Sequence, residues 1–310
     1  MRVPPEFIRF YALASSSLFA TQNTVSLGHE RQVTYNEQPR VELRDLEHWG
    51  HYAAATYQNF ETWDDCNVCQ EPDIQNSSIA ATWSTVIPAY SRGFVAVHHG
   101  RQQVVVAFRG STHVMDALTD IQTLQTAWPP NVDGSRVHSG FLRAYNAASS
   151  LIEKTLDGVA DLGYELVFVG HSLGAAQATL AYVDWQSRSW KGGSKLVALG
   201  APRVGNIWFA RRLNDLGGRS GKVLRVVHES DVVVHLPRSI YSGQYVHNDR
   251  ELWLCDRDGN EEMELIVCPL SEDEDSKRDH SCSAGISPVR WNIQDHLVYP
   301  GMQFGIPSFD

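Results

Sequence analysis

The sequence predicts an α/β fold, in which a mostly parallel central sheet carries helices on both faces. Apolar segments with strand character alternate with segments of helical periodicity along most of the chain, a pattern typical of parallel sheets. The chain has 310 residues, enough for one large α/β domain or two small ones. No internal repeat or long linker divides it. We therefore expect a single domain over residues 25–310, preceded by a separate segment at residues 1–24.

The individual elements follow in order. Residues 41–60 have helical spacing, with Leu46, Trp49 and Tyr52 on one face. Two strands are predicted at 94–98 and 103–108, around a turn at 99–102. The remaining expected elements are a helix at 140–162, a strand at 165–169, a helix at 175–181, a strand at 195–199, a helix at 206–216, a strand at 222–227 and a hairpin within 251–268 around 256–260. This order gives a sheet whose functional residues should gather where the parallel strands end.

Composition excludes several classes of function. The formal net charge is −10 and the basic residues are scattered, which argues against nucleic-acid binding. No apolar stretch is long enough to span a bilayer. Among the five cysteines, Cys66 and Cys69 favour a small-loop disulfide over a redox pair. Cys268 and Cys282 could close an acidic loop as a second disulfide, and Cys255 would then have no disulfide partner. A zinc site is not expected, because no second close pair of cysteine or histidine residues supplies four tetrahedral ligands.

The N-terminal segment has features of an export signal. Arg2 precedes a modestly apolar stretch at residues 10–20, about the length of the hydrophobic part of a signal peptide. Prolines, a glutamate and serines dilute the pattern, and a disordered extension is the alternative. We expect a secreted protein. Asn76 begins one sequon for N-glycosylation, which is relevant only to an exported chain.

The most informative motif is Gly170-His171-Ser172-Leu173-Gly174. An apolar strand-like run precedes it and a helix-forming run of small residues follows it. In this context G-x-S-x-G predicts a nucleophile elbow, a tight turn that exposes the Ser172 hydroxyl at the carboxyl end of the sheet. The motif therefore predicts an acyl-transfer serine hydrolase with Ser172 as nucleophile.

A serine nucleophile needs a base, and the base needs a carboxylate to orient it. Asp231, just after the strand at 222–227, is the preferred acid, and Glu229 is the rival. Of the histidines downstream, His296 precedes an apolar segment that could hold its loop against the core, and it is the preferred base. The other candidates are His235, which lies close to Asp231 in sequence, His247 and His280.

The oxyanion of the tetrahedral intermediate needs two backbone N–H donors. One should follow the nucleophile, at Leu173. The second should come from a loop after an earlier strand, and the run Phe108-Arg109-Gly110-Ser111 offers the Ser111 N–H. Loss of one such donor costs about 3–4 kcal/mol of transition-state stabilisation.

Together these segments resemble the fungal and yeast class 3 lipases, over the chain from about residue 46 to the C-terminus. The resemblance depends on ordered motifs at 108–111, 137–141, 170–174, 200–206, 229–233 and 295–299. It implies an α/β-hydrolase-like fold with Ser172, Asp231 and His296 as the catalytic triad and with Ser111 and Leu173 as oxyanion donors. Asp120 falls where some members hold an acid that fixes the oxyanion-hole hydroxyl. Both close cysteine pairs also look like disulfides of the yeast lipases.

The chain departs from the family pattern in three ways. Ala175 replaces the second glycine that usually follows the elbow leucine, and Val234 stands where a proline is frequent after the acid. The long disulfide between the first helix and the C-terminus of some members has no counterpart, because no cysteine lies near either end. Because Val234 replaces this proline, the sequence does not determine whether the loop after Asp231 is rigid.

Residues 113–124 should form a short helical lid over the active site, as in the family; an ordinary surface helix is the alternative. Its apolar side chains are Val114, Met115, Leu118, Ile121 and Leu124. An apolar lid that opens at a lipid surface predicts interfacial activation. We expect a triacylglycerol lipase-type esterase, acting at an oil–water or membrane interface without metal or cofactor. Feruloyl esterase or phospholipase A1 activity is an alternative on the same fold, and a catalytically silent lipid-binding protein is an alternative of another class.

Overall fold

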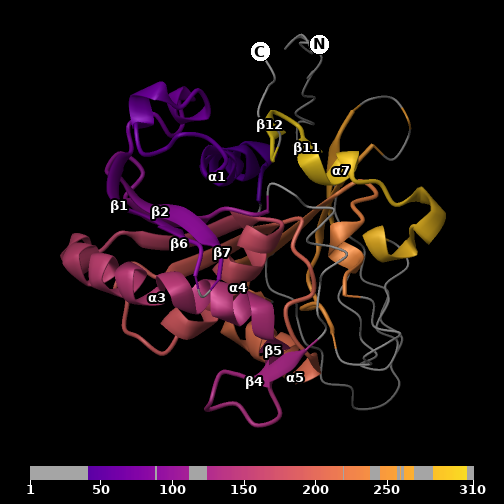
Figure 1. Ribbon diagram of the computed structural model, residues 1–310. Helices are drawn as coiled ribbons and strands as arrows, with labels where there is room; N and C mark the ends of the chain where they lie inside the picture. Colours follow the sequence, from indigo (N-terminus) through magenta and orange to yellow (C-terminus); the bar gives the residue numbers. More distant parts are fainter. Residues whose placement is uncertain are drawn as a thin grey trace, which may run out of the picture.

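The central element is one sheet of eight strands, in the order β1-β2-β3-β6-β7-β8-β9-β10 (Figure 1). The computed structural model describes residues 41–87, 89–111, 124–218, 220–237, 245–256, 259, 262–268 and 282–305. The strands are β1 Ser78–Thr85, β2 Ser91–His98, β3 Gln103–Phe108, β6 Glu165–His171, β7 Ser194–Leu199, β8 Val223–His228, β9 Leu252–Cys255 and β10 Glu264–Val267. Strands β3, β6, β7, β8 and β9 pair in parallel, and the pairs at the two edges are antiparallel. The predicted, mostly parallel sheet is confirmed.

Helices cover both faces of this sheet. Helix α1 (Leu43–Ala55) lies on one face, and α3 (Ser139–Val159) and α4 (Leu173–Trp185) lie on the other (Figure 1). The other helices are α5 Ile207–Leu213, α7 Gln294–Leu297, the π turn η4 Asn214–Gly218 and the 3₁₀ turns η1 Trp63–Asp65, η2 Val68–Gln70, η3 Ala160–Leu162, η5 Val233–His235, η6 Ser283–Gly285 and η7 Pro288–Arg290. Two small ribbons are formed by β4 Gln125–Ala127 with β5 Arg136–His138 and by β11 Val298–Tyr299 with β12 Met302–Gln303.

The period-2 alternation of the strands builds two cores. In β3, Val104 and Val106 belong to the core under α3 and α4, whereas Val105 and Ala107 belong to the core under α1. Successive strand side chains point to opposite faces, so a strand buried on both faces is apolar throughout. The two cores therefore fix β3 and its neighbouring strands, and with them the loops at the carboxyl ends of these strands.

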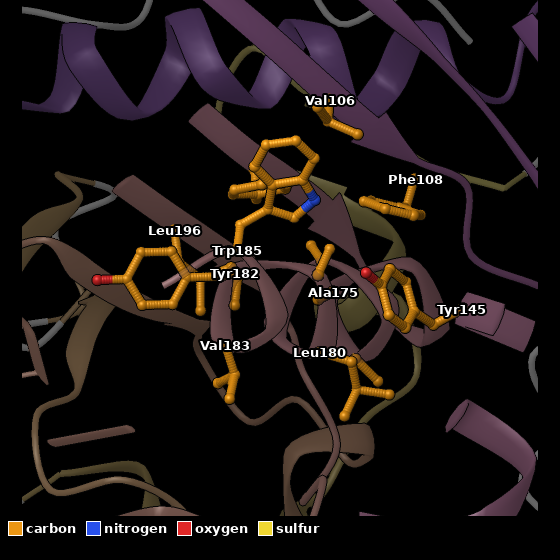
Figure 2. Packing of buried hydrophobic residues seen from close by; sticks show 14 of the residues in the cluster. Val106, Phe108, Tyr145, Ala175, Leu180, Tyr182, Val183, Trp185 and Leu196 are labelled. Carbon is orange, nitrogen blue, oxygen red and sulfur yellow. The ribbon is translucent and has the colours of Figure 1, made fainter. Parts of the chain in front are cut away.

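Helix α4 is buried on almost every side. Its small residues let it lie close to the sheet, and its large side chains fill the space around it, including Tyr182 and Trp185 (Figure 2). Ala175, one of the family departures, is fully buried in this cluster. The start of α4, which follows Ser172, is thus fixed by packing on the sheet and on α3.

Most element predictions hold, and the differences lie mainly at helix ends; the expected helix at 140–162, for example, ends at Val159. The expected helix at 41–60 ends at Ala55, because the chain turns away and Phe60 packs against the ring of Phe94, 5.0 Å between centroids. The expected helix at 206–216 ends at Leu213 and continues as the π turn. The hairpin forms as β9 and β10.

Both expected disulfides are present, Cys66–Cys69 and Cys268–Cys282. Cys255 lies buried outside them. Among the described residues, no helix has the length and apolar character needed to cross a membrane. The N-terminal segment at residues 1–24 lies outside the described residues.

Candidate active site

Ser172 occupies the junction between β6 and α4, as the elbow motif predicts. Its backbone has φ 59° and ψ −127°, a conformation rare for a residue with a side chain and costing roughly 1–3 kcal/mol. The Ser172 N–H donates to the carbonyl oxygen of Leu199 at 2.9 Å, which ties the turn to the neighbouring strand β7. The strained backbone is therefore held by strand, helix and a cross-strand hydrogen bond.

Close backbone approach explains two glycines of the site. A Cβ on Gly174 would lie 2.2 Å from the carbonyl oxygen of Phe108, and a Cβ on Gly110 would lie 2.6 Å from the carbonyl oxygen of His171. The same Cβ on Gly110 would be 3.1 Å from the Ser172 Cβ. The loop after β3 and the elbow therefore touch, and only glycine fits between them.

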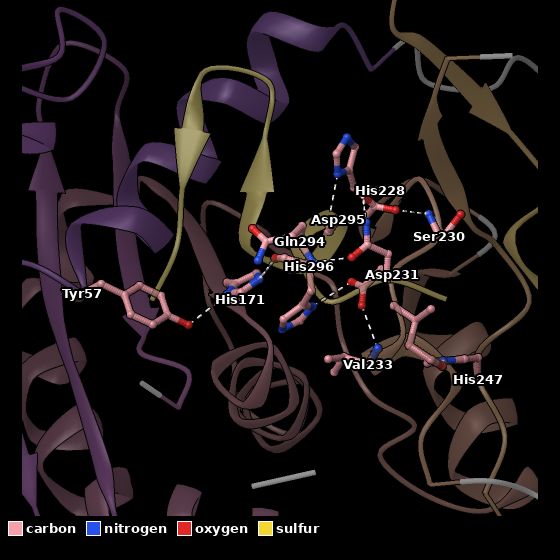
Figure 3. A network of polar contacts seen from close by, with 12 residues as sticks. Tyr57, His171, His228, Ser230, Asp231, Val233, His247, Gln294, Asp295 and His296 are labelled. Atoms are coloured by element: carbon pink, nitrogen blue, oxygen red, sulfur yellow. Dashed lines mark hydrogen bonds and ion pairs between the residues drawn. The ribbon is translucent and has the colours of Figure 1, made fainter. Parts of the chain in front are cut away.

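Asp231 and His296 form a fully buried pair (Figure 3). Asp231 Oδ2 lies 2.8 Å from His296 Nδ1, and Asp231 Oδ1 accepts the Val233 N–H at 2.7 Å. A carboxylate oxygen accepts hydrogen bonds, so Nδ1 carries the proton of the neutral imidazole and Nε2 keeps its lone pair. Among the described residues, Nε2 has no hydrogen-bond partner, and it is therefore available to accept a proton.

Backbone and side-chain hydrogen bonds join the loop of Asp231 to the loop of His296. Asn292 donates its N–H to the carbonyl oxygen of Ser230 at 2.9 Å, and Ser230 donates its N–H to Asp295 Oδ2 at 3.1 Å. His228 bonds to the Asp295 carbonyl oxygen at 2.8 Å. These contacts fix the residues just before Asp231. After Asp231, the Val232 N–H donates to the Asn292 carbonyl oxygen at 3.4 Å, in the loop where Val234 replaces the proline.

Gly200 brings the acid–base pair next to the elbow. It follows Leu199, has φ 56°, and a Cβ there would lie 2.8 Å from Asp231 Oδ2 and 2.9 Å from His296 Nδ1. The acid–base pair therefore contacts the residue that follows Leu199, to whose carbonyl oxygen the Ser172 N–H donates. In the described residues no direct hydrogen bond joins the side chains of Ser172 and His296. Catalytic hydrogen bonds are often loose without substrate.

The rival residues point elsewhere. Glu229 Oε1 accepts the Asp256 N–H at 2.5 Å, on the side of the β9–β10 hairpin. His235 stacks on Trp291 with 4.2 Å between ring centroids, and burial with the nearby Arg203 lowers its pKa to about 4. His247 bonds to the Val234 carbonyl oxygen at 2.7 Å, and burial lowers its pKa well below the usual value. His280 lies outside the described residues.

The predicted oxyanion donors lie in the two segments that touch, the elbow at the start of α4 and the loop after β3. Leu173 is the first residue of α4, where N–H groups have no intrahelical acceptor and the helix dipole favours negative charge. Ser111 follows Gly110 at the end of β3. The supporting Asp120 and four of the five predicted lid side chains (Val114, Met115, Leu118, Ile121) lie outside the described residues; Leu124 is described and is 65% exposed.

Two residues without a predicted role also lie at the site. Tyr57 Oη is 2.9 Å from His171 Nδ1, and the His171 ring lies 4.4 Å from the His296 ring (Figure 3). His171 stands beside the nucleophile in sequence, a signal that could have drawn attention to it. Tyr57 lies 114 residues before it and belongs to no motif, so only the fold reveals the contact.

One described group has the spacing of metal ligands, namely Glu251, Cys268 and Cys282. The two cysteines are joined as a disulfide, and Glu251 accepts from Arg225 at 2.7 Å. The donors of this group are therefore already engaged, and the group lies outside the contacts of the elbow.

Comparisons with known proteins show which family this chain resembles. A family model described as Lipase (class 3) matches residues 105–240. A lipase of Rhizomucor miehei is 32% identical over 79% of this chain and 64% of its own length. A secreted mono- and diacylglycerol lipase A of Penicillium cyclopium is 34% identical over 69% of this chain and 70% of its own length.

A solved lipase structure is also similar to this chain. A triacylglycerol lipase whose catalytic centre is formed by a serine protease triad has a TM-score of 0.72 and 28% identity, covering 85% of this chain and 96% of that chain. The chain spans about two-thirds of the length of the curated Rhizomucor relative, 64%.

Proposed function

The chain belongs to the class 3 lipase family, and from this premise we propose that it is a serine esterase that releases fatty acids from acylglycerols. The observation that carries the proposal is the buried Asp231–His296 pair beside the strained elbow at Ser172, with an Nε2 that has no hydrogen-bond partner in the described part of the chain. An aspartate-oriented histidine next to an elbow serine is the arrangement that activates a hydroxyl for acyl transfer.

In the proposed mechanism the Ser172 oxygen attacks the ester carbonyl carbon while His296 Nε2 takes the hydroxyl proton. Asp231 Oδ2 accepts a hydrogen bond from the Nδ1–H of His296 and stabilises the imidazolium. The negative oxygen of the tetrahedral intermediate is held by the N–H groups of Leu173 and Ser111. His296 then gives its proton to the departing alcohol, and the acyl group remains on Ser172.

The second half-reaction restores the enzyme. Water donates a proton to His296 Nε2 as its oxygen attacks the acyl carbon, and the fatty acid leaves when His296 returns that proton to the Ser172 oxygen. The proposed chemistry uses only side chains and backbone of this chain and requires no metal or cofactor.

A release assay on four substrates tests this proposal. Purified protein is given emulsified triacylglycerol, emulsified diacylglycerol, phospholipid vesicles and methyl ferulate, and the released acid is measured. We expect the fastest release from an emulsified acylglycerol. Faster release from phospholipid or from methyl ferulate would assign the alternative activity, and no release from any of them would support a silent lipid-binding protein.

Exposed apolar side chains near the site support action at a lipid surface. Val86 and Ile87 are 74% and 88% exposed in the loop between β1 and β2. This loop lies close to the carboxyl end of β3. Gly93 near the start of β2 pairs with Phe108 at the end of β3, and the Arg109 N–H donates to the Arg92 carbonyl oxygen at 2.8 Å. Exposed apolar groups of this kind mark interaction surfaces.

The double substitution Val86→Ser with Ile87→Ser should weaken the action on emulsions selectively. We expect at least about a ten-fold lower rate on emulsified acylglycerol, because transfer of each aliphatic side chain into lipid is favourable. The kcat/KM for a dissolved short-chain ester should stay within about a factor of two, because neither residue belongs to the elbow or the acid–base pair.

The matched control is Leu162→Ser, at the opposite edge of the sheet beyond the end of α3, where the side chain is 39% exposed. It should leave both rates unchanged. Equal losses on emulsion and dissolved ester in the double variant would contradict a specific interfacial role. The wild type should also show a rise in rate when a sparingly soluble ester passes its solubility limit.

We also propose that the protein is exported. The Penicillium relative is named as secreted, and two disulfides are typical of oxidising compartments. Residues 1–24 are the proposed export signal and residues 25–310 the single mature domain. N-terminal sequencing of protein from the culture medium tests the boundary between residues 24 and 25.

A further inference from the structure

We propose that Tyr57 and His171 form a positioning pair that fixes the main chain of His296 against the nucleophile elbow. This inference rests on the proposed function, in which His296 is the base. Neither residue touches the reacting atoms in the proposed mechanism. Their role is to place the groups that do.

A continuous line of hydrogen bonds carries the proposal. His171 Nε2 lies 2.8 Å from the carbonyl oxygen of His296, and His171 Nδ1 lies 2.9 Å from Tyr57 Oη (Figure 3). The side chain that directly precedes the nucleophile thus holds the backbone of the base, across 125 residues of sequence. The imidazole of His296 can then meet Ser172 in only a narrow range of positions.

The donor and acceptor chemistry of the three groups determines which atom carries each proton in this chain of hydrogen bonds. A carbonyl oxygen can only accept, so His171 Nε2 carries a proton and donates it to His296. A neutral imidazole has one N–H, so Nδ1 must accept, and the Tyr57 hydroxyl donates to it. Burial, followed by the neighbouring His296, lowers the pKa of His171 well below its usual value, which is consistent with the neutral ring. His171 therefore does not compete for the proton that His296 takes up.

Ring packing restricts the same residue. His171 contacts two rings: the ring of Phe304, 4.0 Å away and nearly parallel at 8°, and the ring of His296, 4.4 Å away and tilted by 35°. It is fully buried. A ring stacked on one side and hydrogen-bonded at both nitrogens has little freedom, so it can transmit a fixed position to His296.

Tyr57 extends the connection to the loop of the proposed oxyanion hole. A Cβ on Gly110, the residue before Ser111, would lie 2.2 Å from Tyr57 Oη. The guanidinium of Arg109 lies 5.4 Å from the centre of the Tyr57 ring. One hydroxyl group therefore contacts the loop before Ser111 and the side chain before Ser172. Removal of this hydroxyl should disturb both placements.

The test compares three variants on a dissolved short-chain ester. His171→Phe keeps a ring for packing but removes both hydrogen bonds, and it should lower kcat about 10- to 100-fold with KM within about two-fold, since small misplacements of a base are costly. His171→Gln keeps a donor for the His296 carbonyl and should recover kcat to within about five-fold of the wild type. Tyr57→Phe removes a single oxygen atom and should lower kcat about three- to ten-fold.

A second Tyr–His contact in the chain supplies the control. His99 Nδ1 lies 3.1 Å from Tyr164 Oη at the opposite edge of the sheet, so His99→Phe should leave kcat unchanged. Melting temperatures are measured for all variants, and Tyr57→Phe keeps the test decisive if His171→Phe does not fold. A wild-type kcat in Tyr57→Phe, or a rise in KM with unchanged kcat in Tyr57→Phe and His171→Phe, would overturn the positioning role. A wild type without ester hydrolysis would instead overturn the proposed function.

Discussion

Replacement of Ser172 by alanine is expected to lower kcat on any ester substrate by about a million-fold, the loss typical when the nucleophile of such a triad is removed. The proposed mechanism has no other group that could form the acyl-enzyme, and a Cβ without oxygen cannot attack. The residual rate should come from the oxyanion donors and from binding alone.

The fold of this variant should be intact. The Ser172 side chain is 3% exposed at the start of α4, and the contacts that hold the turn are made by its backbone. We expect a melting temperature within a few degrees of the wild type. Ser150→Ala, on the exposed side of α3, is the control and should keep full activity. Ester hydrolysis at more than about one-thousandth of the wild-type rate by Ser172→Ala would contradict the assignment.

Replacement of Asp231 by asparagine should lower kcat by about ten-thousand-fold through the tautomer of His296. The asparagine oxygen can still accept the Val233 N–H, as Asp231 Oδ1 does at 2.7 Å. Its NH₂ group would then face His296 Nδ1, which now lies 2.8 Å from Asp231 Oδ2. Nδ1 would have to accept, the proton would move to Nε2, and His296 could no longer act as a base.

The matched control for this substitution is Glu229→Gln, in the rival acid of the same loop. The Glu229 carboxylate faces the hairpin and accepts the Asp256 N–H, so we expect kcat within about two-fold of the wild type. Nitrogen-15 spectra of His296 should show the Nδ1–H tautomer in the wild type and the Nε2–H tautomer in Asp231→Asn. A larger loss in Glu229→Gln than in Asp231→Asn would reverse the roles of the two acids.

Much of the fold follows from local pattern in the sequence. The runs at Val104–Val106 and Leu166–Val169 are apolar at every position, which predicts strands buried on both faces, and the structure places alternate residues in the two cores. Helix ends were less predictable. The first helix ends at Ala55 because Phe60 packs against Phe94, a tertiary contact that no local pattern contains.

In the candidate site, too, local features could be predicted from the sequence and long-range contacts could not. The elbow motif contains its own geometry, so the backbone of Ser172 could be anticipated from the glycines around it. The sequence pattern favours His296 among the histidines, and the family resemblance assigns it the role of base. The contact itself depends on which loop folds back to Asp231, and sequence separation says little about that. The structure brings His296 to Asp231 through bonds from Asn292 and Asp295 to the loop before it.

The contact of Tyr57 with His171 was beyond sequence patterns altogether. It joins the end of the first helix to the end of β6 across 114 residues, and neither partner is part of a pattern that predicts the other. Such contacts arise from the packing of α1 on one face of the sheet (Figure 1).

The central claim is that the Ser172 hydroxyl is made nucleophilic by His296 and Asp231, and covalent labelling tests it most directly. Wild-type protein is treated with an alkyl fluorophosphonate, and the adduct is located by peptide mass spectrometry. We predict one adduct per chain, on Ser172, with labelling slowed at least about a thousand-fold in Asp231→Asn. No adduct, an adduct on another residue, or equally fast labelling of Asp231→Asn would contradict the claim.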